Sequence, residues 1–408
     1  MPRRTRLPFA SVKALLLENI HSEAERVLSA RGFEVETRAT ALSPEELTEA
    51  LSGVNYLGIR STTDVPAEVL DSSPELRAIG AFCIGTNQID LAAASRNGVA
   101  VFNAPYSNTR SVVELAIAEV ISLSRGLTEK NCNMHAGLWD KSAVGSHEVR
   151  GRTLGIIGYG NIGSQLSVLA EALGMRVLFF DIADRLPLGN ARRCDTLVEL
   201  LGESDIVSLH VDGRAENAGF FGANEFAAMR PKSHFINLCR GHVVDHEALH
   251  DVLASGHLAG AAIDVFPSEP KKRDDNFGSV LQHMPNVILT PHVGGSTLEA
   301  QEDIGRYVAG KLADYDALGS TSMSVNLPDI PTGSFKARRI VHLHHNVPGV
   351  MAGLNRILAN SDLNIGAQSL ATRGQIGYAI TDVEGAPEEG MLEQLRSLDG
   401  TIRVRVLP

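Results

Sequence analysis

The sequence has few cysteines and no long apolar run. Its four cysteines, Cys83, Cys132, Cys194 and Cys239, are scattered over 408 residues without a Cys-x-x-Cys pair. This spacing argues against a disulfide framework and a zinc site and fits reduced thiols, so we expect a cytoplasmic protein with no bound metal. No segment approaches the roughly 20 consecutive apolar residues of a membrane span, and we expect no membrane partner.

An excess of positive charge is also lacking. The chain has 37 Lys and Arg against 48 Asp and Glu, a net charge of −11, which argues against a nucleic-acid partner. Hydrophobic residues make up 44% and charged residues 21%, as in ordinary globular proteins. Because 408 residues exceed one ordinary core, we expect two or three domains.

Short apolar segments alternate with helix-like stretches through the centre of the chain. Segments rich in Val, Ile and Leu between helices are typical of a parallel sheet that is covered on both faces. The central segments are Leu154–Ile157, Arg176–Phe180, Asp205–Leu209, His234–Leu238, Ala259–Ile263 and Asn286–Leu289. A smaller set predicts a second α/β unit near the N-terminus: Lys13–Leu17, Val54–Ile59, Leu76–Ala81 and Val99–Phe102.

Two long helices are expected at the borders of the central unit. Ser111 with Glu114, and Ser296 with Glu299, have the spacing of capping boxes before apolar stretches. If the first helix leaves the N-terminal unit and the second returns to it, that unit is discontinuous. We therefore predict one domain at 1–110 and 297–330, with a second domain at 111–296 inserted in it.

The C-terminal part follows a segment with Pro328, Pro331 and Gly333, which is typical of a linker. The pattern after it predicts the order strand, helix, strand, strand, helix, strand. This order describes a small ferredoxin-like domain at 337–408. Its expected strands are Arg338–His344, Leu363–Leu370, Gln375–Val383 and Thr401–Val406, and its helices are Pro348–Asn360 and Glu388–Leu398.

The motif Gly158-Tyr-Gly160-Asn161-Ile162-Gly163 directly follows a predicted strand and opens a helix. In such a loop the first glycine permits the turn, the second lets a pyrophosphate approach, and the third lets the helix pack on the strand. Asp181 ends the next strand, where a carboxylate binds ribose hydroxyls and repels a 2′-phosphate. The pattern favours NAD over NADP.

Polar residues follow four further strands of the predicted sheet. They are His210, Cys239-Arg240-Gly241, Asp264 and Pro291-His292. In open α/β sheets ligands bind beyond the carboxyl ends of the strands. Oxidation of a 2-hydroxy acid needs a group that holds the carboxylate, which suits an arginine, and a base for the hydroxyl, which suits a histidine. Glu269, in a proline-pinned loop, is a candidate partner for that histidine.

These motifs together resemble the D-2-hydroxyacid dehydrogenases. The resemblance rests on Gly158–Gly163, Arg240-Gly241, Asp264–Pro270 and Pro291–Gly295, and also on Gly85–Gln88 and Asn103–Ser111. It implies an α/β fold with a Rossmann-type nucleotide-binding domain inserted in a flavodoxin-like substrate domain, and a ferredoxin-like ACT domain at the C-terminus. The implied activity is NAD-dependent oxidation of 3-phospho-D-glycerate to 3-phosphooxypyruvate, the first step of L-serine synthesis.

The resemblance also implies the roles of individual residues. Arg240 would hold the substrate carboxylate, His292 would be the acid/base, and Glu269 its partner. Arg60, Ser61 and Asn108 would bind the rest of the substrate. The residues implied around NAD are Gly158, Gly160, Asn161, Ile162, Gly163, Asp181, His210, Leu238, Cys239, Arg240, Asp264, His292, Gly294 and Gly295.

Two positions depart from the family pattern. Thr62 stands where a second basic residue is expected, and a hydroxyl cannot neutralise a phosphate; Cys239 stands where a serine is usual. Thr62 keeps open another 2-hydroxy acid, such as 2-hydroxyglutarate, as the main substrate. An NAD-sensing corepressor with the same catalytic residues is an alternative from another class, against which the ACT-like segment and Asn103–Ser111 argue.

The loop of the ACT-like domain reads His342-Leu-His344-His345-Asn346-Val-Pro-Gly349. By family resemblance His344, Asn346 and Asn364 would bind L-serine as an inhibitor between paired ACT domains, which implies a homo-oligomer, in this family a tetramer. A metal site is an alternative, because His342 and His344 would share one face of a strand. No further clustered Cys or acidic ligand accompanies them. A helix-capping asparagine with exposed histidines is the third interpretation.

Overall fold

In this computed structural model the structure describes residues 12–270, 276–333, 335 and 338–407. The chain divides into two compact units, one made of Met1–Ser107 and Gln301–Pro408 and the other of Asn108–Ala300. Each unit is described by itself. No helix in the described ranges is both long enough and apolar enough to cross a bilayer.

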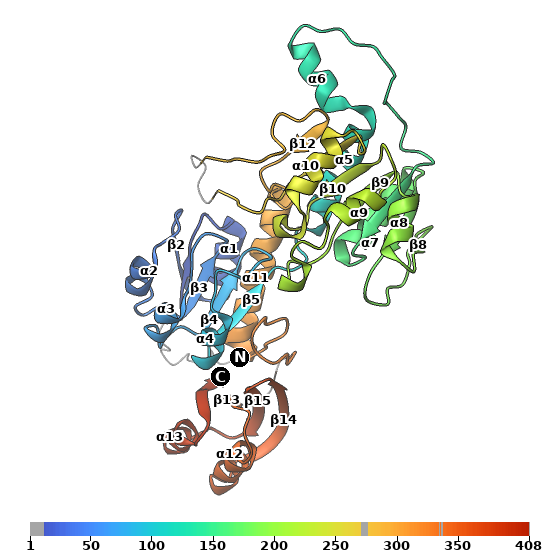
Figure 1. Cartoon of the computed structure of the whole chain (residues 1–408). Coiled ribbons are helices and arrows are strands. Elements are labelled where there is room, and N and C mark those ends of the chain that lie inside the picture. Colours follow the sequence, from blue (N-terminus) through green and yellow to red (C-terminus); the bar gives the residue numbers. More distant parts are fainter. Residues whose placement is uncertain (1–11, 271–275, 334, 336–337, 408) are drawn as a thin grey trace, which may run out of the picture. The chain divides into compact units, whose positions relative to one another are not determined.

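The N-terminal part of the first unit contains a five-stranded sheet among the described residues, with strand order β2-β1-β3-β4-β5 and every pairing parallel (Figure 1). This is the order of a flavodoxin-like doubly wound sheet. The strands are β1 Val12–Leu16, β2 Phe33–Thr37, β3 Tyr56–Ile59, β4 Ala78–Ala81 and β5 Ala100–Asn103. The helices are α1 Ser22–Ala30, α2 Pro44–Ala50, α3 Ala67–Asp71 and α4 Leu91–Arg96.

Buried side chains explain why these segments form strands. Every residue of β3, β4 and β5 is buried, which requires the continuous apolar segments that the sequence shows. β2 lies at the edge of the sheet and exposes Glu34 and Glu36. β2 is not evident from the sequence, because an exposed edge strand carries no apolar run.

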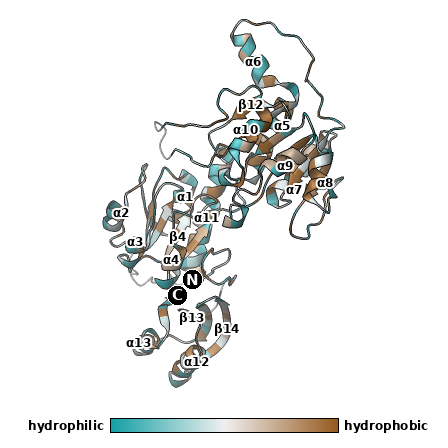
Figure 2. Cartoon of the chain, viewed as in Figure 1, coloured by the Kyte–Doolittle hydropathy of each residue, from teal (hydrophilic) through white to brown (hydrophobic). Residues whose placement is uncertain are grey.

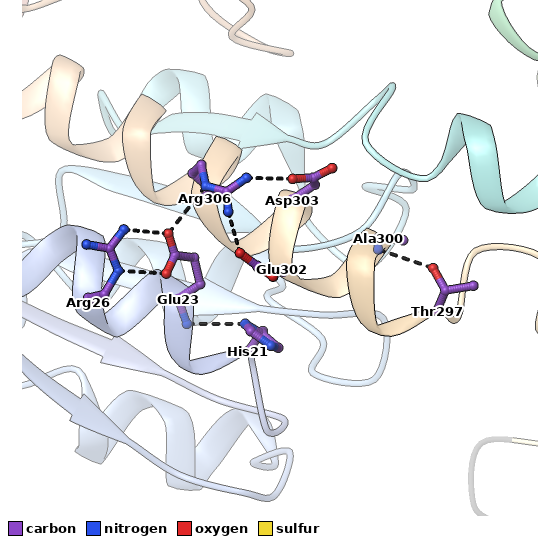
Figure 3. Close-up of polar contacts among 8 residues, drawn as sticks. All are labelled: His21, Glu23, Arg26, Thr297, Ala300, Glu302, Asp303 and Arg306. Atoms are coloured by element: carbon purple, nitrogen blue, oxygen red, sulfur yellow. Dashed lines mark hydrogen bonds and ion pairs between the residues drawn. The ribbon is translucent and has the colours of Figure 1, made fainter.

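A single carboxylate joins α1 to the long helix α11 (Leu298–Leu318) (Figure 3). Glu23 accepts two hydrogen bonds of 2.7 Å from Arg26 and one of 3.3 Å from Arg306. The hydrogen bonds from Arg26 lower the pKa of Glu23 to about 2. Arg306 also pairs with Glu302 and Asp303 of its own helix, so it is bound by three carboxylates.

The second unit contains a seven-stranded parallel sheet within the described residues, with order β12-β11-β10-β9-β6-β7-β8. This is the Rossmann order, extended by one strand. The strands are β6 Thr153–Ile157, β7 Arg176–Phe180, β8 Arg192–Arg193, β9 Ile206–Leu209, β10 His234–Asn237, β11 Gly260–Ile263 and β12 Val287–Leu289.

Helices flank this sheet, and one of them is largely hydrophilic. The helices are α5 Thr109–Arg125, α6 Leu127–His135, α7 Asn161–Ala172, α8 Leu197–Glu203, α9 Ala223–Ala228 and α10 His246–Ala254, with 3-10 turns η1 Ala215–Asn217 and η2 Gly241–Val243. Figure 2 shows α6 largely in the hydrophilic colour, and no residue of α6 is buried.

The two predicted capping boxes are wrong in detail. α5 begins at Thr109 after Asn108, and the hydroxyl of Ser111 is instead 2.7 Å from the hydroxyl of Thr297. Glu114 forms an ion pair with Arg110 at 2.6 Å. At the second helix Thr297 caps, because its hydroxyl accepts a hydrogen bond of 3.2 Å from the N–H of Ala300 (Figure 3). At α5 the predicted capping hydroxyl bonds Thr297 instead, and at α11 the capping hydroxyl lies one residue later than predicted.

The C-terminal sheet is antiparallel, with order β14-β15-β13-β16. Two helices and the strand pairs follow the ferredoxin-like βαββαβ order. The elements are β13 Arg338–His345, α12 Val350–Asn360, β14 Asn364–Arg373, β15 Ile376–Glu384, α13 Glu389–Ser397 and β16 Thr401–Leu407. The fold is thus α/β with two parallel sheets and one antiparallel C-terminal sheet.

Candidate active site

The glycine loop lies between β6 and α7, and each glycine has a distinct steric reason. Gly158 has φ +92°, and a Cβ there would lie 2.5 Å from the carbonyl oxygen of His210. A Cβ on Gly163 would lie 2.2 Å from the carbonyl oxygen of Gly158. A Cβ on Gly160 would meet no described atom within 4 Å. Gly158 and Gly163 therefore shape the loop, and Gly160 leaves open the side that a phosphate can approach.

The N-terminus of α7 adds electrostatic attraction at this point. The helix has 12 residues and begins after Gly160, which has no side chain with which to cap the first turn. N–H groups at a helix N-terminus carry partial positive charge and bind phosphate. Asn161 and Ile162 lie in that first turn, as the nucleotide motif requires. The loop thus fits a dinucleotide.

Asp181 is fixed beside the glycine loop. One carboxylate oxygen accepts a hydrogen bond of 2.8 Å from the N–H of Tyr159, and the other accepts one of 2.8 Å from the N–H of Ala183. Arg185 lies 3.7 Å from the same carboxylate. Each carboxylate oxygen can accept a second hydrogen bond. The Asp181 carboxylate is therefore fixed next to the glycine loop and keeps room to accept further hydrogen bonds.

Arg240 is held by its backbone at the carboxyl end of β10. Its carbonyl oxygen accepts a 3.2 Å hydrogen bond from Asn237, and its guanidinium donates one of 2.6 Å to the carbonyl of Cys239. A Cβ on Gly241 would lie 1.9 Å from the carbonyl carbon of Phe266, so only glycine allows this approach. The thiol of Cys239 is buried, which raises its pKa to about 11 and leaves it a neutral donor to Asn237.

Asp264 organises the loop that carries His292. The Asp264 carboxylate is 1% exposed and accepts hydrogen bonds from the hydroxyl of Thr290 at 2.6 Å and from the N–H groups of Val293 and Gly294 at 2.8 Å. Its carbonyl oxygen accepts another from the N–H of His292 at 2.8 Å. These bonds hold His292 at φ 52°, a left-handed conformation that a histidine rarely adopts.

His292 and Glu269 form a hydrogen-bonded pair. Nδ1 of His292 lies 2.8 Å from one Glu269 oxygen, and the other oxygen accepts a 3.0 Å bond from the N–H of Phe266. The hydrogen bond with Glu269 raises the pKa of His292, against the opposing effect of burial. Burial works to raise the pKa of Glu269, but the bonds from His292 and Phe266 outweigh it and lower that pKa. The pair leaves Nε2 of His292 for proton transfer.

His210, the other histidine after a strand, is a different case. Its Nε2 lies 2.8 Å from the Ser208 hydroxyl, and burial lowers its pKa to about 4. It is therefore neutral near pH 7, and no carboxylate orients it within the described residues. Of the two histidines that follow strands of this sheet, His292 has the environment of an acid/base.

The predicted substrate residues fall in both units. Arg60 and Ser61 follow β3 in the first unit, where they line a cavity of about 350 Å³ together with Glu18, Ala39, Ala41 and Thr62. Asn108 belongs to the second unit, where a Cβ on Gly295 would lie 2.3 Å from its amide nitrogen. The amide oxygen of Asn108 is buried without a hydrogen-bond partner among the described residues.

In the C-terminal sheet, His344 is 2% exposed and its Nδ1 lies 2.8 Å from the carbonyl of His345. Asn346 and Asn364 are exposed, and their amides donate to the carbonyl of Gly374 and to Glu384 at 3.1 Å. His342 bonds the Thr401 hydroxyl at 2.8 Å. No group of three His, Cys, Asp or Glu side chains suited to a metal occurs in the described part of the chain.

Two acidic residues were missed by sequence reasoning. Glu18 accepts hydrogen bonds from the backbone of the loop that carries Arg60, which nothing in its own neighbourhood indicates. Glu119 lies on the buried face of α5 with 3% exposure. The sequence does indicate that Glu119 is buried, because it lies in the same apolar stripe as Ala116 and Val120. It does not show which group an acid in such a stripe would contact.

Comparisons with known proteins agree with this geometry. Residues 117–294 match the NAD-binding domain of the D-isomer specific 2-hydroxyacid dehydrogenases, and residues 340–403 match an AHAS small subunit-like ACT domain. Among solved structures, a D-lactate dehydrogenase from Sporolactobacillus aligns with TM-score 0.67 and 27% identity over 77% of this chain and 99% of that one. The fold and the site thus define an NAD-dependent 2-hydroxyacid dehydrogenase.

Relatives that match over nearly their full length indicate the family of 2-hydroxyacid dehydrogenases to which this chain belongs. The D-3-phosphoglycerate dehydrogenase of Escherichia coli K12 is 50% identical over 399 residues, 97% of each chain. That of Haemophilus influenzae is 47% identical over 409 residues and the full length of both. This chain therefore belongs to the family of D-3-phosphoglycerate dehydrogenases with a C-terminal ACT domain.

Proposed function

We propose that this enzyme reversibly oxidises 3-phospho-D-glycerate to 3-phosphooxypyruvate with NAD, the first step of L-serine biosynthesis. The observation that carries the proposal is the 2.8 Å bond between His292 and Glu269, in the unit that holds the glycine loop. Full-length identity of about half with D-3-phosphoglycerate dehydrogenases supports the choice of substrate.

The mechanism assigns one task to each catalytic side chain. The guanidinium of Arg240 binds the substrate carboxylate, because its planar donors match two carboxylate oxygens. Nε2 of His292 accepts the proton of the C2 hydroxyl, and Glu269 stabilises the imidazolium that forms. The glycine loop and Asp181 would hold NAD, which would supply the acceptor for the hydride of C2. In the reverse direction His292 returns its proton to the carbonyl oxygen.

The remaining predicted residues position the two ligands. Arg60, Ser61 and Asn108 bind the phosphate end and backbone of the substrate. The glycine loop and Asp181 bind the pyrophosphate and adenosine ribose, and Asp264 and the loop 290–295 bind on the nicotinamide side. The contacting residues are those predicted above, within a nucleotide domain at 111–296 and a substrate domain at 1–110 and 297–330.

A different 2-hydroxy acid is the second candidate substrate. Thr62 lines the cavity next to Arg60, and Arg60 is the cation among the residues that line it. A single cation neutralises a carboxylate more completely than a phosphate dianion, which favours an acid such as 2-hydroxyglutarate. The ratio of kcat/KM for the two acids decides, and a clear preference for 2-hydroxyglutarate would replace the first candidate.

Regulation by L-serine is assigned to the ACT domain at 337–408. His344, Asn346 and Asn364 bind the amino acid between two paired ACT domains. Strand β14, which carries Asn364, lies at an edge of its sheet and is exposed along almost its whole length, so it can meet a second copy. The proposed effector is therefore bound only in a homo-oligomer.

The second unit offers a further surface to a second copy of the chain. α6 and the segment after it expose Met134 by 51%, Leu138 by 59%, Trp139 by 74% and Val144 by 89%. Large apolar side chains that are exposed in one segment suit an interaction surface. With pairing at the ACT domains, a second pairing here gives a tetramer, which acts in the cytoplasm.

The test is NADH formation from 3-phospho-D-glycerate, followed by absorbance with and without L-serine. We expect turnover that serine suppresses. Absence of turnover would contradict the enzymatic assignment, whereas turnover that ignores serine would contradict only the regulatory one. His292→Ala should lower kcat by at least about 100-fold, as loss of general acid–base catalysis does.

A further inference from the structure

Glu18 has an unusual place at the end of β1. Its side chain extends to the loop that follows β3, and the residue is only 9% exposed. Oε1 accepts hydrogen bonds from the N–H groups of Arg60 at 3.1 Å and Thr63 at 2.9 Å, and Oε2 accepts one from the N–H of Thr62 at 3.0 Å. One carboxylate thus binds three backbone N–H groups of the loop after β3.

The backbone conformation of Glu18 points the same way. Glu18 has φ 60° and Asn19 has φ 54°, both in the left-handed region that non-glycine residues rarely adopt. Such a conformation persists when surrounding contacts fix it, and it is common at functional sites. The contacts around it are the three bonds from the loop 60–63 to the carboxylate, and the backbone N–H groups of Glu18 and Asn19, which each donate at 3.4 Å to carbonyl oxygens of Thr40 and Arg38.

A second buried side chain holds the same loop by its carbonyl. Gln88 is 8% exposed, and its amide donates a hydrogen bond of 2.5 Å to the carbonyl oxygen of Arg60. Glu18 and Gln88 come from different loops, yet both bind the backbone of Arg60. Both the backbone N–H and the backbone carbonyl of Arg60 are therefore held by hydrogen bonds. Only the position of its side chain is left to vary.

We propose that Glu18 is a positioning residue of the substrate site, which holds the loop 60–63 so that Arg60 and Ser61 present their side chains to the phosphate group of the substrate. The proposal rests on the function proposed above. Glu18, Arg60 and Ser61 all line the same cavity of about 350 Å³. Because the Glu18 carboxylate is bound to three N–H groups, its charge is partly balanced at the wall of a cavity that takes an anion.

The proposal requires a carboxylate and not merely a side chain of this size. A glutamine has one acceptor oxygen, so its amide NH₂ would face a backbone N–H as donor against donor. In Glu18→Gln at least one of the N–H groups of Arg60, Thr62 and Thr63 then loses its partner. The loop shifts, and binding of the phosphorylated substrate weakens while the chemistry at C2, carried by other residues, continues.

The experiment measures kcat and KM of the full-length enzyme for both substrates. Glu18→Gln should raise KM for 3-phospho-D-glycerate about tenfold, the size expected for losing one charge-assisted hydrogen bond, with kcat and the KM for NAD within about twofold. The matched control is Glu46→Gln. Glu46 also accepts a backbone N–H, that of Ser43 at 2.8 Å, but in the capping box of α2 and not in the cavity lining.

A double-mutant cycle with Arg60→Ala separates positioning from general structure. If Glu18 acts through Arg60, adding Glu18→Gln to Arg60→Ala should raise KM by less than about twofold further, because coupled residues are not additive. Inorganic phosphate, used as an inhibitor competing with substrate, should lose affinity in Glu18→Gln in parallel with the rise in KM. The control variant should keep both values.

Three results would overturn the proposal: a KM unchanged in Glu18→Gln, equal losses of kcat and of affinity for both substrates, or full additivity with Arg60→Ala. If Glu18→Gln does not fold, Gln88→Leu removes the second contact with Arg60 and must raise KM selectively, or the proposal fails. If the wild-type enzyme has no turnover with 3-phospho-D-glycerate, the proposed function fails instead, and phosphate affinity still reports on Glu18.

Discussion

Glu119 lies buried on the inner face of α5, where burial and the nearby charge of Asp264 together raise its pKa to about 8. Neither of its carboxyl oxygens has a hydrogen-bond partner among the described residues. Asp264, by contrast, accepts three hydrogen bonds on its carboxylate. Near neutral pH the folded state therefore keeps a proton on Glu119, next to the carboxylate that organises the His292 loop.

This relationship predicts that Glu119 makes stability fall as pH rises. The folded pKa of about 8 exceeds the ordinary value of 4.5, so the folded state binds the proton more tightly than the unfolded chain. Below about pH 4.5 Glu119 is protonated in both the folded and the unfolded state, so the free energy of unfolding keeps its full value there. Between pH 4.5 and pH 8 the free energy of unfolding falls, and the total loss above pH 8 is on the order of 5 kcal/mol.

The comparison of wild type with Glu119→Gln checks this prediction. Chemical denaturation between pH 5 and 9 should show the variant gaining stability relative to wild type as pH rises, because glutamine cannot ionise. Glu114→Gln is the control, since Glu114 lies on the same helix but is exposed and pairs with Arg110. Parallel pH curves for wild type and Glu119→Gln would show that Glu119 is not the titrating group.

Glu269 should set the pH dependence of the oxidation. His292 must be neutral to accept the substrate proton, and the hydrogen bond with Glu269 raises its pKa. In Glu269→Gln the pKa of His292 falls, so the rise of kcat/KM with pH should move to lower pH. Because the imidazole also loses its orienting partner, kcat at the new optimum should be about 10- to 100-fold lower. A pH profile of kcat/KM with an unmoved acid limb would contradict the pairing.

Substitutions in the glycine loop should separate effects on stability from effects on NAD binding. Gly163→Ala should lower the free energy of unfolding by about 1–3 kcal/mol, because its Cβ meets the Gly158 carbonyl. Gly160→Ala meets nothing in the protein, so it should keep its thermal midpoint but weaken NAD binding about tenfold or more. Thermal melts without NAD and a titration with NAD measure the two effects. Gly202→Ala in α8, where an added Cβ meets no atom within 4 Å, should lower neither the thermal midpoint nor the affinity for NAD.

Asn364 gives a test of the effector site. Its side chain is exposed and donates a hydrogen bond to Glu384 on the surface, so Asn364→Ala should fold normally. Loss of one buried hydrogen bond to serine should raise the serine concentration for half-inhibition at least about tenfold, with activity in the absence of serine unchanged. Asn360→Ala, at the end of α12, is the control. Unaltered serine inhibition in Asn364→Ala would remove this residue from the site.

The fold can be predicted from the sequence where buried strands and helices appear as apolar patterns. The buried strands of both parallel sheets are continuous apolar segments, and all six elements of the C-terminal domain were predicted within a few residues. The edge strands β2 and β8 were not predicted, because they expose charged residues such as Glu34 and Arg192. The start of α11 was placed one residue early, since capping depends on which hydroxyl reaches the N–H groups.

By itself, the sequence determined the dinucleotide loop with its acid and the side chains available for chemistry at the strand ends: Arg240, Glu269 and His292. These follow from local rules, because a glycine motif and the order of strands and polar residues are properties of the chain. Only the tertiary structure decided which groups meet. Glu269 reaches His292 across 23 residues and Glu18 reaches Thr63 across 45, and such pairings depend on how the sheet brings distant loops together.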